Sequence, residues 1–156
     1  MMLGGRYETL ELLGSGGMGD VYLASDLENR TRRVAVKLLK EEVSDDIVMR
    51  FDRECELLSR VSHPAIVKVL DRGAADKQVY FVMEYVAWPT LAQRLTARQK
   101  SEQPFSLQEA VALLARLADA LDHLPGLGIV HRDLKPSNVL VSDELDLRVI
   151  DFGLAG

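Results

Sequence analysis

A run of closely spaced glycines, Gly14, Gly16 and Gly19, lies between two stretches of strand-like sequence. Residues 7–13 and 21–24 place β-branched, aromatic or other apolar side chains between polar ones, which is typical of strands. The run matches the Gly-x-Gly-x-x-Gly pattern of dinucleotide-binding turns, but such a turn has to open a helix. Because a strand follows here, we expect a glycine hairpin. It is either a plain flexible turn or a loop whose backbone can approach phosphate groups closely.

The rest of the first half continues in strand-like sequence with a single helix. We expect further strands at residues 33–39, 66–70 and 79–85, and an amphipathic helix at residues 45–60. The expected organisation is therefore a five-stranded antiparallel sheet with one helix.

The second half changes to helical spacing after residue 86. Helices are expected at residues 91–99 and 107–124, with Ser106 and Glu109 forming a capping box in front of the second. Seven apolar residues between Leu107 and Leu124 make one stripe on that helix, and short strands are expected at residues 139–141 and 148–150. We therefore divide the α+β chain into two parts, residues 1–86 and 87–156.

Composition limits the classes of partner and the cellular compartment. The chain has 19 Lys and Arg against 24 Asp and Glu, a formal net charge of −5, which argues against binding nucleic acid by bulk positive charge. Its single cysteine, Cys55, excludes an intrachain disulfide and suits a reducing compartment. No signal peptide or membrane-spanning apolar stretch stands out. We expect a cytoplasmic chain with no nucleic-acid partner, any membrane anchor of a longer form lying outside these residues.

A buried charge pair is expected between the third strand and the first helix. Lys37 ends the apolar segment Val-Ala-Val-Lys, and Glu54 lies on or beside the apolar stripe of the helix. In isolation, Lys37 could simply extend its ammonium group to solvent. A carboxylate next to an apolar stripe needs a partner, however, and Lys37 is the natural one for Glu54. A lysine held in this way acts as a point charge for phosphates.

The segment 131–138 (HRDLKPSN) brings three chemically useful side chains into one short loop. Asp133 can accept a proton from an attacking hydroxyl, and Lys135 can neutralise charge on a transferring phosphoryl group. Asn138 and, after the loop, Asp151 of the Asp-Phe-Gly tripeptide offer hard oxygen ligands for a cation such as Mg²⁺. The segment therefore points to phosphoryl transfer.

Taken in order along the chain, these motifs resemble those of protein kinases of the serine/threonine type. The resemblance runs from about Tyr7 to the last residue and includes the glycine run, Lys37, Glu54, a hinge at residues 83–86 (MEYV), the loop and the Asp-Phe-Gly tripeptide. The residues in several of these motifs are most similar to those of the bacterial eukaryotic-like (Hanks-type) branch. The resemblance implies a bilobal kinase fold and an ATP-dependent kinase that phosphorylates Ser or Thr on a protein substrate.

The resemblance also implies a role for each matching residue. Lys37, oriented by Glu54, would hold the α and β phosphates of ATP, Asp133 would be the catalytic base, and Lys135 would stabilise the transferring group. Asn138 and Asp151 would hold Mg²⁺. The nucleotide would be contacted by Leu13, Gly14, Ser15, Gly16, Gly17, Met18, Gly19, Val21, Ala35, Lys37, Met83, Glu84, Val86 and Leu140.

Two departures from the family pattern bear on activity. Trp88 and Pro89 follow the hinge where Gly-Gly is frequent, and the printed residues end at Gly156, before the activation segment and the rest of the C-lobe. We therefore expect a kinase N-lobe and hinge at residues 1–86 and the first part of a C-lobe at residues 87–156. Two alternatives stay open: a non-catalytic nucleotide-binding or protein-interaction fragment, and a small-molecule kinase that shares the fold.

Overall fold

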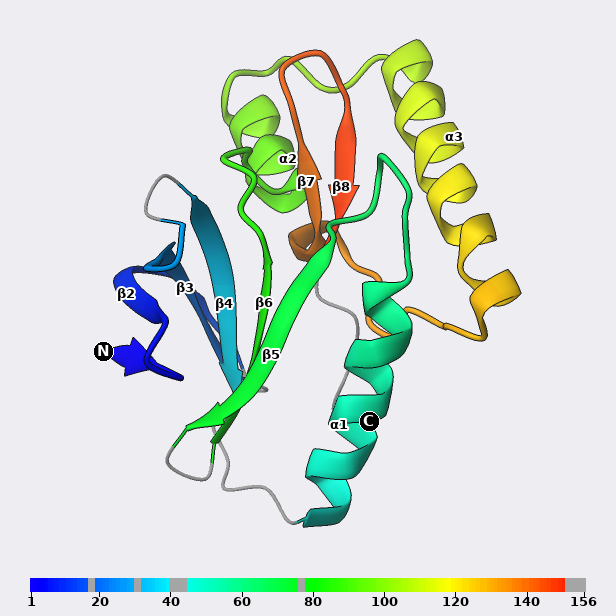
Figure 1. The fold of residues 1–156 in the computed structure, drawn as a ribbon. Helices are drawn as coiled ribbons and strands as arrows, with labels where there is room; N and C mark the ends of the chain where they lie inside the picture. The colour runs from blue at the N-terminus through cyan, green and yellow to red at the C-terminus, as the bar shows by residue number, and fades with distance from the viewer. Residues whose placement is uncertain (17–18, 30–31, 40–44, 76–77, 151–156) are drawn as a thin grey trace. The chain divides into compact units, whose positions relative to one another are not determined.

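The computed structural model describes residues 1–16, 19–29, 32–39, 45–75 and 78–150, and the chain forms two compact units within it (Figure 1). The first unit comprises residues Met1–Arg60 and Lys68–Tyr85. Among the described residues, the second comprises residues Val61–Val67 and residues 86–150. The short segment between α1 and β5 therefore belongs to the second unit although it lies within the first half of the sequence.

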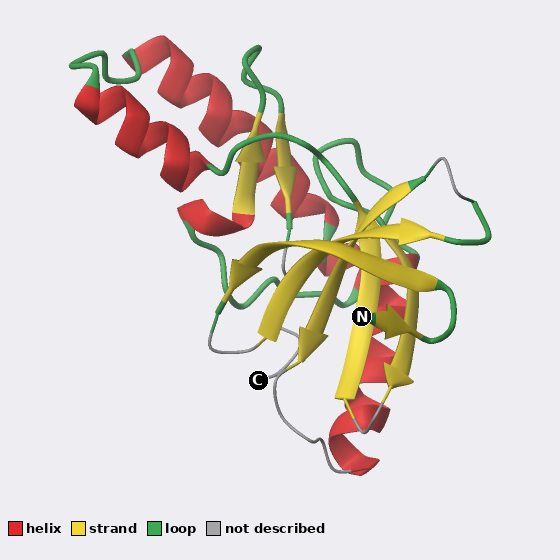
Figure 2. Cartoon of the chain, turned by 90° about the vertical axis from the view of Figure 1, so that its left-hand side faces the viewer, coloured by secondary structure: helices red, strands yellow, loops and turns green. Residues whose placement is uncertain are grey.

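The first unit is built on an antiparallel six-stranded sheet. Figure 2 shows the strands as yellow arrows. The strands of the sheet are β1 (Met2–Leu3), β2 (Tyr7–Ser15), β3 (Gly19–Asp26), β4 (Arg33–Leu39), β5 (Val69–Ala75) and β6 (Gln78–Glu84). Their order in the sheet is β1-β2-β3-β4-β6-β5. Strands β2, β3 and β4 are therefore neighbours in the sheet in the same order as in the sequence.

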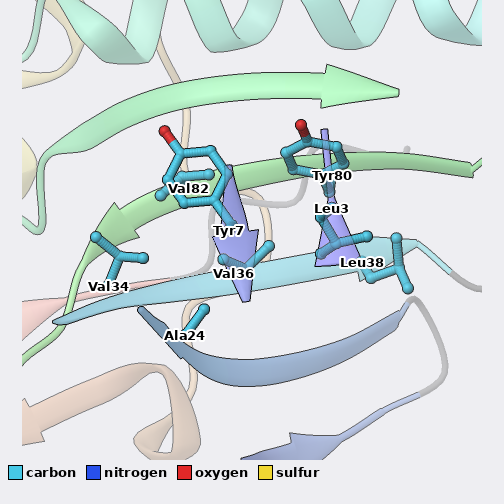
Figure 3. Packing of buried hydrophobic residues seen from close by; sticks show 8 residues of the cluster. All are labelled: Leu3, Tyr7, Ala24, Val34, Val36, Leu38, Tyr80 and Val82. Atoms are coloured by element: carbon cyan, nitrogen blue, oxygen red, sulfur yellow. The ribbon is translucent and has the colours of Figure 1, made fainter. Parts of the chain in front are cut away.

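The sheet buries apolar side chains on both faces because residues alternate along each strand. On one face, eight residues form a cluster that Figure 3 shows gathered around β4 and β6: Leu3, Tyr7, Ala24, Val34, Val36, Leu38, Tyr80 and Val82. Helix α1 (Asp45–Ser59) covers the other face, where the ring of Phe51 lies 6.0 Å from that of Phe81. Both rings are almost completely buried, which fixes α1 on the sheet.

The second unit combines helices with a small hairpin. Its helices are α2 (Leu91–Lys100), α3 (Leu107–His123) and the 3₁₀ turns η1 (Pro125–Leu127) and η2 (Pro136–Asn138). Strands β7 (Val139–Val141) and β8 (Leu147–Val149) form the hairpin. Both α-helices begin with a complete capping box, Thr90 with Gln93 and Ser106 with Glu109, as the sequence predicts for the second.

The predicted apolar stripe of α3 divides into a covered and an exposed part. Within the stripe, Leu124 is buried and Leu117 and Leu121 are half-buried, whereas Leu107, Val111 and Leu114 are 82%, 57% and 63% exposed. The buried residues of α3 itself, Leu113 and Ala120, lie outside the predicted stripe, so the helix buries a side that is rotated from the predicted one. No helix in the described part of the chain is long and apolar enough to cross a membrane.

Two details of the expected sheet are wrong, although its antiparallel arrangement with one helix agrees with the prediction. A sixth strand, β1, pairs with β2 through Leu3 and Tyr7. The strand expected at residues 66–70 is shifted to Val69–Ala75. The reason is that Ile66 and Val67 bond instead to Val149 of β8, with Val67 N–H donating to the Val149 carbonyl at 3.0 Å.

Candidate active site

The glycine run forms the tip of the β2–β3 hairpin, as its flanking strands predict. Gly14 pairs with Val21, Ser15 pairs with Asp20, and the Gly16 N–H donates to the Gly19 carbonyl at 3.0 Å. Gly17 and Met18, which we expected to contact the nucleotide, lie outside the described residues. The observed turn therefore excludes the strand-to-helix connection that a dinucleotide-binding fold requires.

The three glycines of the pattern differ in what their surroundings require. A Cβ atom on Gly19 would collide with the main-chain carbonyl of Leu38 on β4, so close packing of the sheet requires glycine there. A Cβ on Gly14 would meet nothing within 4 Å, and one on Gly16 only the Gly19 carbonyl at 3.9 Å. Neither of these two has a positive φ angle. Packing among the described residues therefore does not account for glycine at positions 14 and 16.

Four of the predicted nucleotide contacts project from one face of the sheet. In the registers of β3, β4 and β6, Val21 lies opposite Lys37, and Ala35 lies opposite Met83. Residues directly opposite each other share a face, and Ala35 and Lys37 are two positions apart on β4. Lys37 also lies opposite Phe81, which contacts α1. The structure thus collects these four side chains on the α1 face.

Lys37 is only 5% exposed, which excludes the alternative that it merely extends to solvent. A buried ammonium group is costly unless a partner compensates its charge. The predicted partner, Glu54, lies on α1 three residues after Phe51, but its side chain is outside the described part of the structure. The Lys37–Glu54 pair therefore stays a prediction, supported by the placement of α1 on the Lys37 face.

The remaining predicted contacts lie at the ends of elements. Leu13 on β2 is 42% exposed, and Val86 and Leu140 are half-buried. At the end of β6, the Glu84 N–H donates to the Lys68 carbonyl at 3.0 Å, and the Glu84 carboxylate accepts from the Lys68 N–H at 3.2 Å. These bonds fix the position at which the predicted hinge begins.

The loop 131–138 brings the predicted catalytic groups together. Lys135 Nζ lies 3.2 Å from Asp133 Oδ2. The Asn138 side-chain amide donates from Nδ2 to the Asp133 main-chain carbonyl at 2.8 Å and to Asp133 Oδ2 at 3.2 Å. Asn138 is buried, Asp133 is half-buried and Lys135 is exposed. A carboxylate, an ammonium group and an amide therefore converge at the surface of the second unit.

A buried histidine holds the loop in shape. His131 Nε2 lies 3.0 Å from the Ile150 carbonyl, and the Asp133 N–H donates to His131 Nδ1. A carbonyl can only accept, so Nε2 is the donor in its contact with Ile150. Between them, Arg132 has φ +65°, a left-handed conformation that strains a residue with a side chain and recurs at functional sites. The loop is therefore built to place Asp133.

The surroundings of Asp133 favour its ionised form. The hydrogen bond from Lys135 is the main cause that lowers the pKa of Asp133 below its ordinary value, and the hydrogen bond from Asn138 adds to it. Partial desolvation acts in the opposite direction but does not prevail. Asp133 is thus held as a carboxylate that can accept a hydrogen bond from a hydroxyl group.

The donor set of this loop fits a hard divalent cation. The two acceptors of the Asn138 amide named above both belong to Asp133, so the NH₂ group of Asn138 points toward Asp133 and its carbonyl oxygen Oδ1 points away from it. An amide oxygen of this kind suits Mg²⁺. The second expected ligand, Asp151, lies outside the described residues. Among the described residues, no cluster of three or more His, Cys, Asp or Glu side chains could hold a metal ion.

Sequence reasoning missed one contact near the predicted base-binding residue Leu140. The guanidinium of Arg148, which lies opposite Leu140 on the hairpin, is 4.9 Å from the centre of the Trp88 ring. The two residues are sixty positions apart, and no local pattern links them. The only signal was Trp88 itself, a large aromatic residue directly after the hinge.

Comparison with known proteins agrees with this geometry. The family model described as protein kinase domain matches residues 7–156. The chain is 39% identical over 155 residues to the serine/threonine-protein kinase PrkC of Bacillus subtilis, and 40% identical over 159 residues to PknB of Mycobacterium tuberculosis. Each alignment covers 98% of this chain but only 23% and 25% of the relative. The chain therefore spans about a quarter of the length of these curated relatives.

Solved structures give the same family. The kinase domain of M. tuberculosis PknI superposes with a TM-score of 0.82 at 32% identity, covering 97% of this chain and 59% of that one. Residues 1–466 of Rad53, in complex with AMP-PNP, superpose with a TM-score of 0.83 at 26% identity, covering 96% of this chain and 38% of that one. The expected kinase fold and the expected relationship to bacterial serine/threonine kinases are confirmed, and the chain belongs to the protein kinase domain family.

Proposed function

We propose that this chain carries the nucleotide-binding and catalytic-loop part of a protein serine/threonine kinase that uses Mg·ATP. The observation that carries the proposal is the convergence of Asp133, Lys135 and Asn138 within one loop. In such a kinase, the bond between the β–γ bridging oxygen and the γ phosphorus breaks as the acceptor hydroxyl oxygen bonds to that phosphorus. The products are ADP and a phosphorylated Ser or Thr of the protein substrate.

Each side chain has a defined task in this reaction. The Asp133 carboxylate orients the acceptor hydroxyl and takes up its proton, which its lowered pKa permits over a wide pH range. The Lys135 ammonium offsets negative charge on the transferring group. Lys37 on β4 holds the non-transferred phosphates as a point charge, and Glu54 orients it. Mg²⁺, held by Asn138 Oδ1 and Asp151, would neutralise charge on the phosphate oxygens.

The glycine hairpin supports the same proposal. Gly14 and Gly16 have no side chain, although a Cβ atom at either position would not collide with any described part of the protein. A bare backbone lets main-chain N–H groups approach phosphate oxygens closely. The contacts with the base are assigned to Val21, Ala35, Met83, Glu84, Val86 and Leu140. We also assign residues 1–86 to the N-lobe and hinge, and residues 87–156 to the first part of the C-lobe.

A thermal melt of the 156-residue chain tests the nucleotide site first. Mg·ATP at about 100 times its Kd should raise the free energy of unfolding by roughly 2.7 kcal/mol. Lys37→Ala should remove this increase. Transfer of labelled phosphate to a basic protein, with Asp133→Asn as the inactive control, then tests the reaction. A cooperative melt that Mg·ATP leaves unchanged would favour the alternative of a non-catalytic interaction fragment, which the named relatives do not favour.

A further inference from the structure

The β7–β8 hairpin has one buried face and one partly open face. Val139, Val141, Leu147 and Val149 are at most 3% exposed and form the buried face. Leu140 and Arg148 lie between them in the two strands, and they are directly opposite each other in the register. Both are half-buried. Since opposite residues of a strand pair share a face, Leu140 and Arg148 together form the partly open face.

Trp88 extends this face from the segment that follows the hinge. The Arg148 guanidinium lies 4.9 Å from the centre of its ring, within the range of a cation–π contact. The Trp88 ring is half-buried. Arg148 is held in turn by a hydrogen bond from Nη1 to the Leu147 carbonyl at 3.0 Å. The indole therefore has a supported position on the second unit, close to the residue opposite Leu140.

The segment 86–90 does not need a large aromatic side chain at position 88 to hold it in place. The Val141 N–H already donates to the Pro89 carbonyl at 2.9 Å, and Thr90 forms a bridge with Leu140. Thr90 also closes the capping box of α2 with Gln93. These main-chain and cap contacts fix the segment without a large aromatic side chain. A flat, half-buried ring against Arg148, the residue opposite Leu140, is therefore available to contact a ligand.

We propose that Trp88, supported by Arg148, is a specificity-determining residue whose indole contacts the nucleoside part of a nucleotide bound on the Leu140 face of the hairpin. The inference rests on the proposed function, in which Leu140 contacts the purine base. An indole prefers planar, apolar partners, so within the nucleoside it recognises the face of the base, and it does not recognise the phosphates. Arg148 acts through Trp88 and is a positioning residue.

The chain itself offers a direct probe, because Trp88 is its only tryptophan. Its fluorescence is titrated with adenosine, with Mg·ATP and with inorganic triphosphate, which carries the phosphates without a nucleoside. We expect a saturable change in emission with adenosine and with Mg·ATP, and none with triphosphate. Binding of adenosine or Mg·ATP, measured by calorimetry, without any change in Trp88 emission would overturn the inference.

Substitutions separate ligand contact from a structural role. Trp88→Leu should weaken adenosine and Mg·ATP binding roughly three- to ten-fold, and Trp88→Phe should restore most of the loss. Arg148→Met should shift the emission of the free chain and weaken binding by a smaller factor. The matched control is Phe105→Leu, since Arg98 stacks on Phe105 at 4.3 Å in the same unit. Phe105→Leu should leave nucleoside affinity unchanged.

The outcomes distinguish the two proposals. If the wild-type chain binds no nucleotide by calorimetry, the proposed function fails, and this inference fails with it. If Mg·ATP binds and Lys37→Ala abolishes binding, the nucleotide site stands. Equal affinity of wild type and Trp88→Leu would then overturn the role of Trp88 alone. The role of Trp88 would also be overturned if Trp88→Phe did not restore the affinity and Phe105→Leu lost as much affinity as Trp88→Leu. That result would show a general structural effect.

Discussion

Asn138 donates its side-chain amide to both the main-chain carbonyl and the carboxylate of Asp133, at 2.8 and 3.2 Å. This double contact closes the loop between two residues that we assign to different tasks, metal binding and proton transfer. The bond to the main-chain carbonyl fixes the backbone of Asp133, and the bond to Oδ2 holds its carboxylate toward Asn138. The loop is thereby organised before any ligand binds, which is how a site stabilises a transition state without a cost of reorganisation at that moment.

Replacing the proposed base tests this organisation. Asp133→Asn keeps the size of the side chain and can still accept a hydrogen bond from Asn138, but it cannot take up a proton. We expect phosphoryl transfer to fall by a factor of about 10² to 10⁴, with little change in nucleotide affinity. Single-turnover transfer and calorimetry measure the two effects. Undiminished transfer by this variant would remove Asp133 from the proposed mechanism.

The ionisation of Asp133 should depend on Lys135. The hydrogen bond from Lys135 is the largest cause of the lowered pKa of Asp133, so Lys135→Met should raise that pKa toward its ordinary value. The carboxylate would then become protonated at a higher pH than in the wild type. A carbon-13 NMR titration of the Asp133 carboxyl group reads this directly, without relying on activity. Lys100→Met, at the exposed end of α2, is the control, and an Asp133 titration unchanged by Lys135→Met contradicts the assignment.

The glycines of the hairpin should divide into two classes. Gly19→Ala places a methyl group against the Leu38 carbonyl and should lower the free energy of unfolding by about 1–3 kcal/mol. Gly14→Ala meets open space and should change it by less than about 0.5 kcal/mol, while weakening Mg·ATP binding. Denaturant unfolding and calorimetry measure the two quantities. Equal destabilisation by both substitutions would show that the chain's packing, and not a ligand, requires glycine at both positions.

Much of the fold follows from local patterns in the sequence. The spacing of Phe51, Cys55 and Leu58 predicts α1, and all three are buried, since a period of 3.6 residues places them on one side. Strand β1 could not be predicted, because two residues carry no periodic signal and the cluster that buries Leu3 includes residues of β4 and β6 far along the chain. The shift of β5 has a similar cause, because Ile66 and Val67 pair with Val149 far along the chain.

The candidate site shows the same division. Asp133, Lys135 and Asn138 could be predicted together because the outermost two are only five positions apart, so a single loop must hold them. The common face of Val21, Ala35, Lys37 and Met83 depends on the registers of three strands, which the sequence does not specify. The contact between Trp88 and Arg148 depends in addition on the register of the β7–β8 hairpin.

An ion pair between the partly exposed Arg6 and the buried Asp26 should contribute to the stability of the first unit. Arg6 donates from Nε and Nη2 to the two carboxylate oxygens of Asp26, both at 2.8 Å, and Asp26 is only 2% exposed. Arg6→Met leaves this carboxylate buried without its cation, so we expect a loss of about 3 kcal/mol in the free energy of unfolding. The matched control is Arg72→Met, which breaks an exposed pair with Asp52 and should cost less than about 1 kcal/mol. Similar losses in the two variants would refute the special role of Arg6.

The same pair predicts how stability depends on pH. The hydrogen bond from Arg6 is the main cause that lowers the pKa of Asp26 below its ordinary value of 3.8, against the opposing effect of burial. A carboxyl group whose pKa is lower in the folded state stabilises the fold fully above its unfolded value, and this contribution is lost as the pH falls through the folded value. The difference in unfolding free energy between wild type and Asp26→Asn should therefore be constant above about pH 5 and shrink below it. Denaturant unfolding at several pH values measures this, with Asp52→Asn accounting for the general effect of removing one carboxylate. A difference that stays the same down to the acid limit would mean that Asp26 is no more acidic in the folded chain than in the unfolded one.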